Sequence, residues 1–158
     1  MRAVVQRALD ASVSVDGEVL GSFTGPGLVV LVGVTHTDTR EDAQRIARKL
    51  FDLRIFEPHH AAEPVTDERR EFSAAELGLP VLVISQFTLY GDTRKGRRPT
   101  WTGAAPGPIA EPLVEEVVTA LRECGAAVST GKFGADMQVN FTNDGPMTLI
   151  LEQSATQS

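Results

Sequence analysis

The chain has 158 residues, 42% of them hydrophobic and 23% charged, and carries a formal net charge of −6 at pH 7. This length and hydrophobic content suit one folded domain with its own core. The acidic balance argues against a protein that coats nucleic acid with its whole surface, because phosphate binding is mainly cationic. No apolar run is long enough to cross a membrane, and the single cysteine excludes an internal disulfide. These features favour a cytoplasmic protein.

Much of the chain consists of short apolar stretches separated by turn residues, a pattern that predicts about eight strands. These stretches are residues 3–9, 11–15, 18–23, 28–34, 53–56, 81–90, 126–131, 137–143 and 147–152. Asp16-Gly17 is a hairpin turn signal, and Pro26 between two glycines predicts a break in the chain. The stretch over 28–34 does not alternate, so it is expected to be buried on both faces.

Two stretches with helical spacing of apolar residues predict α-helices. The first covers 43–51 and follows N-capping candidates at 37–39. The second covers about 109–124, with an apolar inner stripe and a glycine directly after its end. The stripe consists of Leu113, Val117, Leu121 and Cys124, and the glycine is Gly125.

Residues 58–80 are polar, bounded by prolines and without strong periodicity, which predicts a long loop with a short helical turn over 73–77. The whole pattern predicts a single α+β domain, with mixed or antiparallel β-sheets and two helices packed on one side. We expect this domain to cover residues 1–152 and the remainder, 153–158, to be a disordered tail.

The usual catalytic motifs are nearly all missing from the sequence. The three histidines, His36, His59 and His60, fall in predicted loops without metal-ligand spacing, so we expect them to be solvated and expect no bound metal. Cys124 closes an apolar helix stripe and is expected to be a small core residue rather than a nucleophile. No nucleophile elbow, phosphate-binding loop or dinucleotide fingerprint is present, and no cofactor is expected.

The stretch ISQFTLY, from Ile84 to Tyr90, turns abruptly from apolar to polar. On a strand, its side chains would alternate between two faces. Thr88 could be a nucleophile, although a hydroxyl needs an adjacent base, or it could simply be a good strand residue. A third possibility is that backbone N–H groups stabilise a developing oxyanion where the strand ends. The donor segment would then be Ser85, Gln86, Phe87 and Thr88.

Two further stretches are unusual. Asn143, Asp144 and Gly145 suit a hairpin turn, but Pro146 then stands where the second strand should begin, although proline cannot donate a ladder hydrogen bond. A basic loop carries Arg94, Lys95, Arg97 and Arg98. That loop is either a solvated surface or a local contact for phosphate groups.

Four motifs, MRAVVQR, SQFTLYGDTRKGRRP, TGKFGADMQV and NDGPMT, occur in this order along the chain. With them, the sequence closely resembles the D-aminoacyl-tRNA deacylase family, from Met1 to about Leu151. The chief departure is the segment 58–80, which is longer here than in the members of that family. The resemblance implies the three-layer fold of the family and a homodimer.

The resemblance also implies an activity, which is hydrolysis of the ester that joins a D-amino acid, or mischarged glycine, to the terminal adenosine of tRNA. Gly145-Pro146 would form a cis peptide that reaches into the partner's active site, where its carbonyl oxygens exclude an L-side chain. Arg7 would fix the orientation of that motif, and Met137 would line the pocket. The SQFTLY motif, Ser85 to Tyr90, would line the adenosine and ester site, with Ser85, Gln86, Phe87 and Thr88 as its catalytic residues.

In this family picture, the terminal ribose hydroxyl assists the reaction and the N–H groups of Phe87 and Thr88 steady the oxyanion. The basic loop Arg94 to Arg98 would contact tRNA phosphates. No cofactor, DNA or membrane partner is implied. Two alternatives stay open at this point: an esterase with Thr88 as its nucleophile, and a non-catalytic module that binds RNA ends or another protein.

Overall fold

The computed structural model describes residues 1–67 and 70–154. Within these ranges, three long strands, four short ones and three α-helices make up the fold. The elements are β1 (Arg2–Val15), β2 (Glu18–Gly33), α1 (Arg40–Asp52), β3 (Arg54–Phe56), the 3-10 helix η1 (Pro58–His60), β4 (Phe72–Ser73), α2 (Ala74–Leu77), β5 (Val81–Ser85), the 3-10 helix η2 (Phe87–Tyr90), α3 (Gly107–Glu123), β6 (Val128–Thr130) and β7 (Gln138–Glu152).

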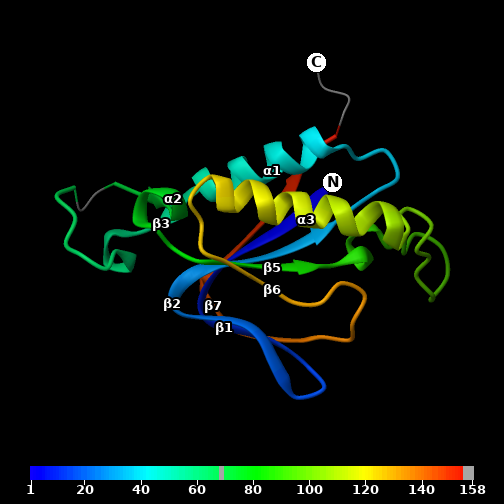
Figure 1. The fold of residues 1–158 in the computed structure, drawn as a ribbon, viewed down its shortest axis with the longest axis horizontal. Coiled ribbons are helices and arrows are strands. Elements are labelled where there is room, and N and C mark those ends of the chain that lie inside the picture. The colour runs from blue at the N-terminus through cyan, green and yellow to red at the C-terminus, as the bar shows by residue number, and fades with distance from the viewer. Residues whose placement is uncertain (68–69, 155–158) are drawn as a thin grey trace.

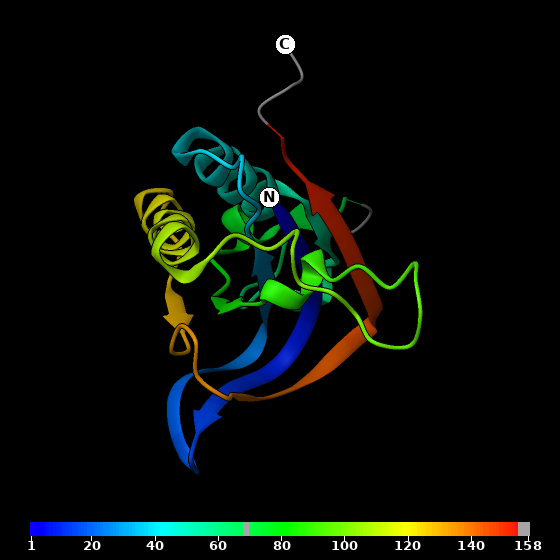
Figure 2. The same ribbon diagram turned by 90° about the vertical axis from the view of Figure 1, so that its right-hand side faces the viewer.

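The main sheet has five strands in the order β6-β5-β2-β1-β7, which leaves β6 and β7 as its edges. β2 runs antiparallel to β1, and β1 antiparallel to β7, whereas β2–β5 and β5–β6 are parallel pairs. The helices α1 and α3 lie side by side over one face of this sheet, as Figures 1 and 2 show. β3 and β4 form a separate two-stranded sheet. The predicted α+β domain, with a mixed sheet and its two long helices on one side, is therefore confirmed.

Each long strand joins two stretches that the sequence pattern separates. β1 continues through Asp10, where φ is +51° and the pairing with β2 shifts by a residue. This bulge reverses the alternation of side chains, as bulges do. Ala3 and Val5 consequently pack under the helices, whereas Ala11 and Val13 pack on the opposite face. The predicted break at the Gly-Pro-Gly of 25–27 is wrong, because β2 also continues through it.

The helix-covered face holds the larger core, and its central side chains come from both layers. Ile46 and Leu50 of α1 and Leu121 of α3 are almost completely buried against Leu28 and Val30 of β2. Thr39 caps α1 as predicted: its hydroxyl accepts the Asp42 N–H at 3.3 Å, and the Asp42 carboxylate accepts the Thr39 N–H at 2.9 Å. This reciprocal cap satisfies two N–H groups that a helix start otherwise leaves free.

Some local predictions differ from the structure. The 58–80 segment contains η1, β4 and α2 rather than one long loop, and α2 is the short helical turn that the sequence predicts. Cys124 is exposed rather than buried, because α3 ends at Glu123 and the chain turns away at Gly125, where φ is +94°. His60 is also buried rather than solvated, with 5% of its surface exposed.

The two chain ends meet in one antiparallel pair. The Met1 amino group donates to the Gln153 carbonyl at 2.7 Å, and the Gln153 N–H donates to the Met1 carbonyl at 2.9 Å. Residues 155–158 of the predicted disordered tail lie outside the described residues. Among the helices of the described ranges, none is long and apolar enough to span a membrane.

Candidate active site

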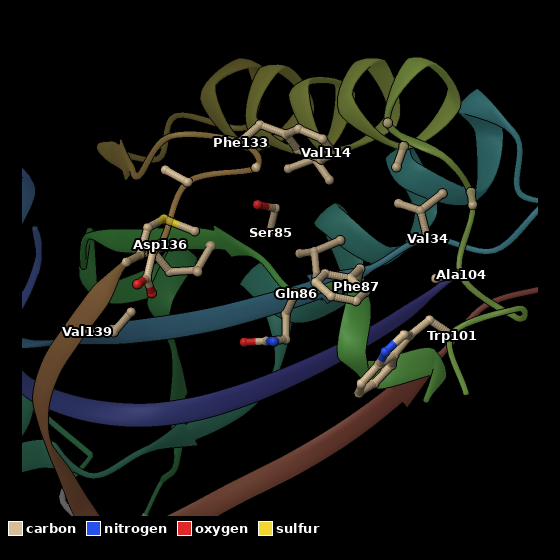
Figure 3. A pocket seen from close by; sticks show the side chains of 18 residues that line it. Val34, Ser85, Gln86, Phe87, Trp101, Ala104, Val114, Phe133, Asp136 and Val139 are labelled. Atoms are coloured by element: carbon tan, nitrogen blue, oxygen red, sulfur yellow. The ribbon is translucent and has the colours of Figure 1, made fainter. Parts of the chain in front are cut away.

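A cavity of about 490 Å³ opens beside the C-terminal end of β5. Its walls are the ends of β2 and β5, one side of α3, and the segments 104–107 and 133–139. The lining is largely apolar, and Asp136 is the one ionisable side chain among the residues that form it. In Figure 3 the rings of Phe87 and Trp101 lie together on one side of the cavity, and Asp136 lies on the other. A concave apolar site with few polar groups is typical of small-molecule binding.

β5 ends at Ser85 instead of continuing to Tyr90, so the predicted alternation of side chains along 85–90 is wrong. The Gln86 N–H donates to the Val32 carbonyl at 2.7 Å and is the last link to the sheet. The backbone then turns into η2, in which the Leu89 N–H donates to the Gln86 carbonyl at 3.3 Å. Because the chain leaves the sheet after β5, the side chains of η2 do not alternate between two faces as they would on a strand. Their own contacts determine where they point.

This turn leaves backbone donors at the cavity. The first N–H groups of a helix have no acceptor inside it. Among the described residues, none accepts a hydrogen bond from the N–H groups of Phe87 and Thr88. They are the two donors that the sequence analysis assigns to oxyanion stabilisation. Their availability fits that assignment, because an oxyanion needs donors that no other group occupies.

Thr88 has no base beside it within the described part of the chain. Its side chain is exposed, and its hydroxyl is hydrogen-bonded by the Gln86 side-chain amide. An amide N–H is a donor and cannot take a proton from a hydroxyl. The structure therefore gives Thr88 none of the activation that a hydroxyl nucleophile needs.

Two aromatic rings are exposed at the rim of the cavity. Phe87 is 57% exposed and Trp101 is 44% exposed, and their ring centres lie 5.4 Å apart in an edge-to-face arrangement. Exposed aromatic rings next to a cavity are suited to stacking on a planar ligand such as a nucleobase. Met137 lines the cavity from the opposite wall and packs over Gly131.

Gly145-Pro146 lies on a bulge of β7 and not in a hairpin turn. The pairing of β7 with β1 jumps from Asn143 opposite Ala8 to Thr148 opposite Gln6, so four residues of β7 have no ladder partner there. The peptide between Gly145 and Pro146 is cis, and both residues are exposed. The predicted hairpin is thus wrong, and the proline is tolerated because a bulge does not require its missing N–H.

The side chain of Asn143 closes the bulge. Its oxygen accepts the Met147 N–H at 3.0 Å, and its amide donates to the Thr148 hydroxyl at 2.8 Å. One amide group therefore ties together the two ends of the segment that leaves the ladder. Such local side-chain bonds replace the backbone pairing that the bulge loses.

Arg7 supports the bulge from β1 and is 7% exposed. Its guanidinium donates to the Asp144 carbonyl at 3.1 Å and to the Ile55 carbonyl at 2.7 Å, and it lies 3.4 Å from the Asp144 carboxylate. A Cβ atom added to Gly145 would come within 2.8 Å of this guanidinium. Arg7 and the Gly-Pro segment are therefore in direct contact, as the predicted role of Arg7 requires.

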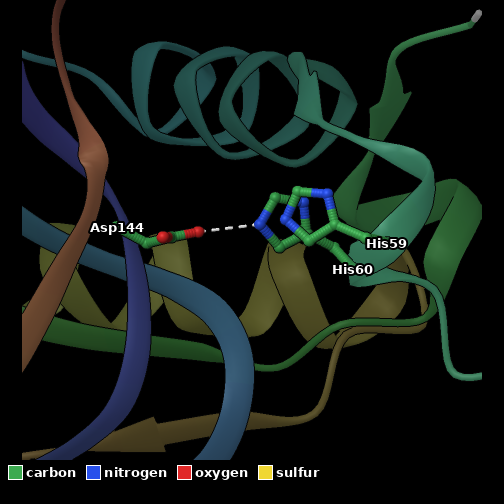
Figure 4. Close-up of side chains that lie close together, drawn as sticks. All are labelled: His59, His60 and Asp144. Carbon is green, nitrogen blue, oxygen red and sulfur yellow. Dashed lines mark hydrogen bonds and ion pairs between the residues drawn. The ribbon is translucent and has the colours of Figure 1, made fainter.

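A buried histidine holds the same segment from the other side (Figure 4). His60 Nε2 and the Asp144 carboxylate are 2.7 Å apart, and His60 Nδ1 accepts the Glu57 N–H at 2.9 Å. Because Nδ1 is an acceptor, the proton must be on Nε2, which donates to Asp144. This hydrogen bond is the main reason that the pKa of Asp144 lies below its ordinary value. The resulting stabilisation is present above the unfolded pKa and is lost as the pH falls through the folded one.

His59, His60 and Asp144 each offer one potential metal ligand, and these atoms lie within 4.8 Å of one another. This is the one group of that kind among the described residues. Both nitrogens of His60 are already engaged in hydrogen bonds. A cation at this place would therefore have to replace the proton between His60 and Asp144.

The basic loop is exposed over its whole length. Arg94 is paired with Asp92 at 2.6 Å, and hydrogen bonds from Arg94 lower the pKa of Asp92 to about 2. Within the part of the chain that the structure describes, Lys95, Arg97 and Arg98 have no acidic partner. Their three charges remain available to an anionic ligand.

Besides the basic loop, the predicted site residues form two groups. Ser85, Gln86, Phe87 and Met137 line the cavity, and Thr88 follows them in η2. Arg7, Gly145 and Pro146 form the second group at the bulge of β7, and none of them lines the cavity.

No functional role is predicted from the sequence for His60, Asn143, Asp144 or Trp101. Asn143 and Asp144 carried a signal in the NDGP stretch, but it fitted a hairpin turn equally well. The sequence contains no signal for the role of His60, because its partner Asp144 is 84 residues away along the chain.

Comparison with known proteins supports one family. A family model described as D-Tyr-tRNA(Tyr) deacylase matches residues 4–152. Proteins named D-aminoacyl-tRNA deacylase from Streptomyces coelicolor and Thermobifida fusca are each 59% identical over 152 residues, covering 96% of this chain and 99% of theirs.

Two solved structures share the fold of this chain. A structure titled c-Myc DNA Unwinding Element Binding Protein superposes with a TM-score of 0.85 at 36% identity, covering 98% of this chain and 100% of that one. A probable eukaryotic D-amino acid tRNA deacylase gives a TM-score of 0.78 at 17% identity over 95% of this chain and 97% of its own, which shows a shared fold. By its sequence, the chain belongs to the D-Tyr-tRNA(Tyr) deacylase family.

Proposed function

We propose that the chain hydrolyses the ester bond of D-aminoacyl-tRNA and of mischarged glycyl-tRNA, and spares L-aminoacyl-tRNA. The observation that carries this proposal is a pair of unoccupied N–H groups, that of Phe87, which lines an apolar cavity, and that of Thr88, which follows it in η2. Such a site suits an activated ester, because the chemistry needs charge stabilisation at one oxygen more than a strong protein nucleophile. The names of the relatives point to the same substrate class.

The proposed reaction is an ester hydrolysis in which water attacks the carbonyl carbon of the aminoacyl group. The carbonyl oxygen becomes an oxyanion and receives hydrogen bonds from Phe87 and Thr88 N–H. The ribose hydroxyl next to the ester assists the proton transfer, and the bond between the carbonyl carbon and the ribose oxygen then breaks. The products are a free amino acid and tRNA with an intact terminal adenosine. Phe87 and Trp101 are placed to stack on the adenine ring.

We propose that chiral selection comes from a second copy of the chain in a homodimer. Gly145 and Pro146 are exposed on an edge strand and do not line the cavity of their own chain. They can therefore act in a cavity only when another subunit supplies it. Backbone carbonyl oxygens placed there would clash with an L-side chain, which selects by rejection. Glycine has no side chain and would pass.

The function is tested by measuring amino-acid release from D-tyrosyl-, L-tyrosyl- and glycyl-tRNA under identical conditions. We expect rapid release from the first and third substrates and little from the second. Equal release from both tyrosyl enantiomers would refute the selectivity. Binding of tRNA without release of any amino acid would instead support a non-catalytic module. The substrate implies action in the cytoplasm, where tRNA is charged.

Replacing Thr88 by alanine distinguishes the proposed mechanism from a threonine esterase. We expect Thr88→Ala to keep kcat/KM for D-tyrosyl-tRNA within about threefold, because the backbone N–H remains and only a hydroxyl without a base is lost. Asp136→Asn, which removes the one ionisable group of the cavity lining, should also remain active. A loss of 1000-fold or more in Thr88→Ala, typical of a deleted nucleophile, would favour the esterase.

The basic loop is tested through the salt dependence of binding. We expect the double variant Arg97→Ala/Arg98→Ala to weaken tRNA binding. The slope of the logarithm of the binding constant against the logarithm of the salt concentration should become shallower by about 1 to 2, because each lost phosphate contact removes roughly 0.7 to 0.9 from this slope. Arg94→Ala is the matched control, since that guanidinium is already paired with Asp92. The role of the loop would be refuted if the double variant kept the wild-type slope.

A further inference from the structure

The bulge that carries Gly145-Pro146 lies on an edge strand, and its residues have no ladder partner on β1. Backbone pairing therefore does not set the direction of the two carbonyl groups. Side-chain contacts must do so, and those of Arg7 and Asn143 come from the sheet itself. The third contact, from His60, comes from outside it.

His60 belongs to η1, within the segment 58–80. Its imidazole is fixed at both nitrogens, by the Glu57 N–H at 2.9 Å and by the Asp144 carboxylate at 2.7 Å. The ring also packs edge-on against Phe56 and lies over the ring of His59. A side chain that is 5% exposed and held at every polar atom has one orientation, so it can act as a rigid support.

Asp144 is the connection between this support and the motif. It directly precedes Gly145, its carbonyl oxygen accepts from Arg7, and its carboxylate lies between Arg7 and His60. With contacts from two sides, the residue cannot rotate without breaking a buried hydrogen bond. The orientation of Asp144 therefore limits the directions that the following Gly145-Pro146 segment can take.

From this geometry we infer that His60 is a positioning residue for chiral selection, which acts through Asp144 to aim the Gly145 and Pro146 carbonyl groups. This inference rests on the proposed function. His60 touches neither the substrate nor the reacting atoms. Its loss should therefore raise the hydrolysis of L-aminoacyl-tRNA, which the carbonyl groups normally exclude. Glycyl-tRNA has no side chain to exclude and should be hydrolysed as before.

The test compares His60→Asn with His60→Gln. The asparagine amide occupies the place of Nδ1 and can accept from Glu57 but cannot reach Asp144, whereas the glutamine amide reaches the place of Nε2. We expect His60→Asn to lower the ratio of D-tyrosyl- to L-tyrosyl-tRNA hydrolysis at least tenfold, with glycyl-tRNA hydrolysis within twofold of wild type. His60→Gln should keep the ratio within about threefold of the wild-type value. His59→Asn is the matched control, because His59 is exposed and does not bond to Asp144.

A double-mutant cycle separates positioning from general damage. In an Asp144→Ala background, which already lacks the acceptor, His60→Asn should not change the ratio further. If His60→Asn lowers the ratio equally in both backgrounds, His60 acts by another route and the inference is wrong. An unchanged ratio in His60→Asn alone would also refute it. Should His60→Asn fail to fold, His60→Phe replaces it, because it keeps a ring in the same place but removes both nitrogens, and it must lower the ratio.

The same measurements tell this inference apart from the proposed function. If the wild-type chain does not prefer D-tyrosyl-tRNA, both are refuted. If the wild type prefers it and the His60 variants behave like wild type, only the inference is refuted.

Discussion

Replacing Arg7 by methionine is expected to lower the free energy of unfolding by about 3 kcal/mol. The substitution keeps the apolar stem but removes the donor of the Ile55 and Asp144 carbonyls, and it leaves the Asp144 carboxylate with His60 as its remaining partner. Removing one partner of a buried ion pair costs about 3–5 kcal/mol. We expect the lower end, because the Asp144 side chain is 25% exposed and partly solvated. Urea denaturation of the variant and wild type gives the difference directly.

Arg40→Met is the matched control for Arg7→Met. Arg40 forms an ion pair with Glu116 at 3.0 Å, but its side chain is 69% exposed. An exposed pair contributes about 0–1 kcal/mol, so this variant should unfold almost like wild type. Arg7→Met should also hydrolyse L-tyrosyl-tRNA faster than the control does. Equal free energies of unfolding for the two variants would show that the buried contacts of Arg7 stabilise the fold no more than the exposed ion pair of Arg40 does.

Replacing Gly145 by alanine is expected to lower the D-to-L ratio of hydrolysis more than tenfold. At φ +126° an L-residue is strained, and the new methyl group would lie 2.8 Å from the Arg7 guanidinium. Arg7 is held by two backbone carbonyl groups and cannot simply move aside. The bulge must therefore shift, at a cost of about 1–3 kcal/mol in stability, and the carbonyl groups shift with it. Parallel assays with D-tyrosyl-, L-tyrosyl- and glycyl-tRNA measure the change.

Gly17→Ala separates backbone strain from this contact. Gly17 also has a positive φ, of +80°, but a Cβ atom there would meet no atom within 4 Å. This variant should lose some stability and keep full selectivity. A Gly145→Ala enzyme with the wild-type ratio would mean that the position of the bulge does not determine which enantiomer is hydrolysed.

The sequence predicts the helices well because each has local signals. Thr39 supplies the cap of α1, and Gly125 marks the end of α3. The three long strands are predicted in the right places but as separate pieces, whereas β4 falls in a predicted loop. The alternation of side chains is interrupted at Asp10 and again at 144–147. Because a bulge interrupts the alternation just as a strand end does, periodicity alone cannot distinguish the two.

The site is predictable only in part, for a similar reason. Ser85, Thr88 and Gly145 lie in motifs that the sequence shows directly, so they could be predicted as site residues. The 3-10 turn after β5 could not be foreseen, because Phe87 and Leu89 are good strand residues that lack a partner strand in the fold. The pairing of His60 with Asp144 depends on tertiary structure alone.

The N–H groups of Phe87 and Thr88 belong to the main chain, which every residue type except proline provides. An inhibitor whose acceptor atoms bind these two groups would therefore depend on the path of the backbone and not on a side chain. Single substitutions that preserve this turn would leave such an inhibitor's main contacts intact. Resistance would then have to come from changes that reshape the turn, and these would disturb the same two donors that the proposed catalysis uses.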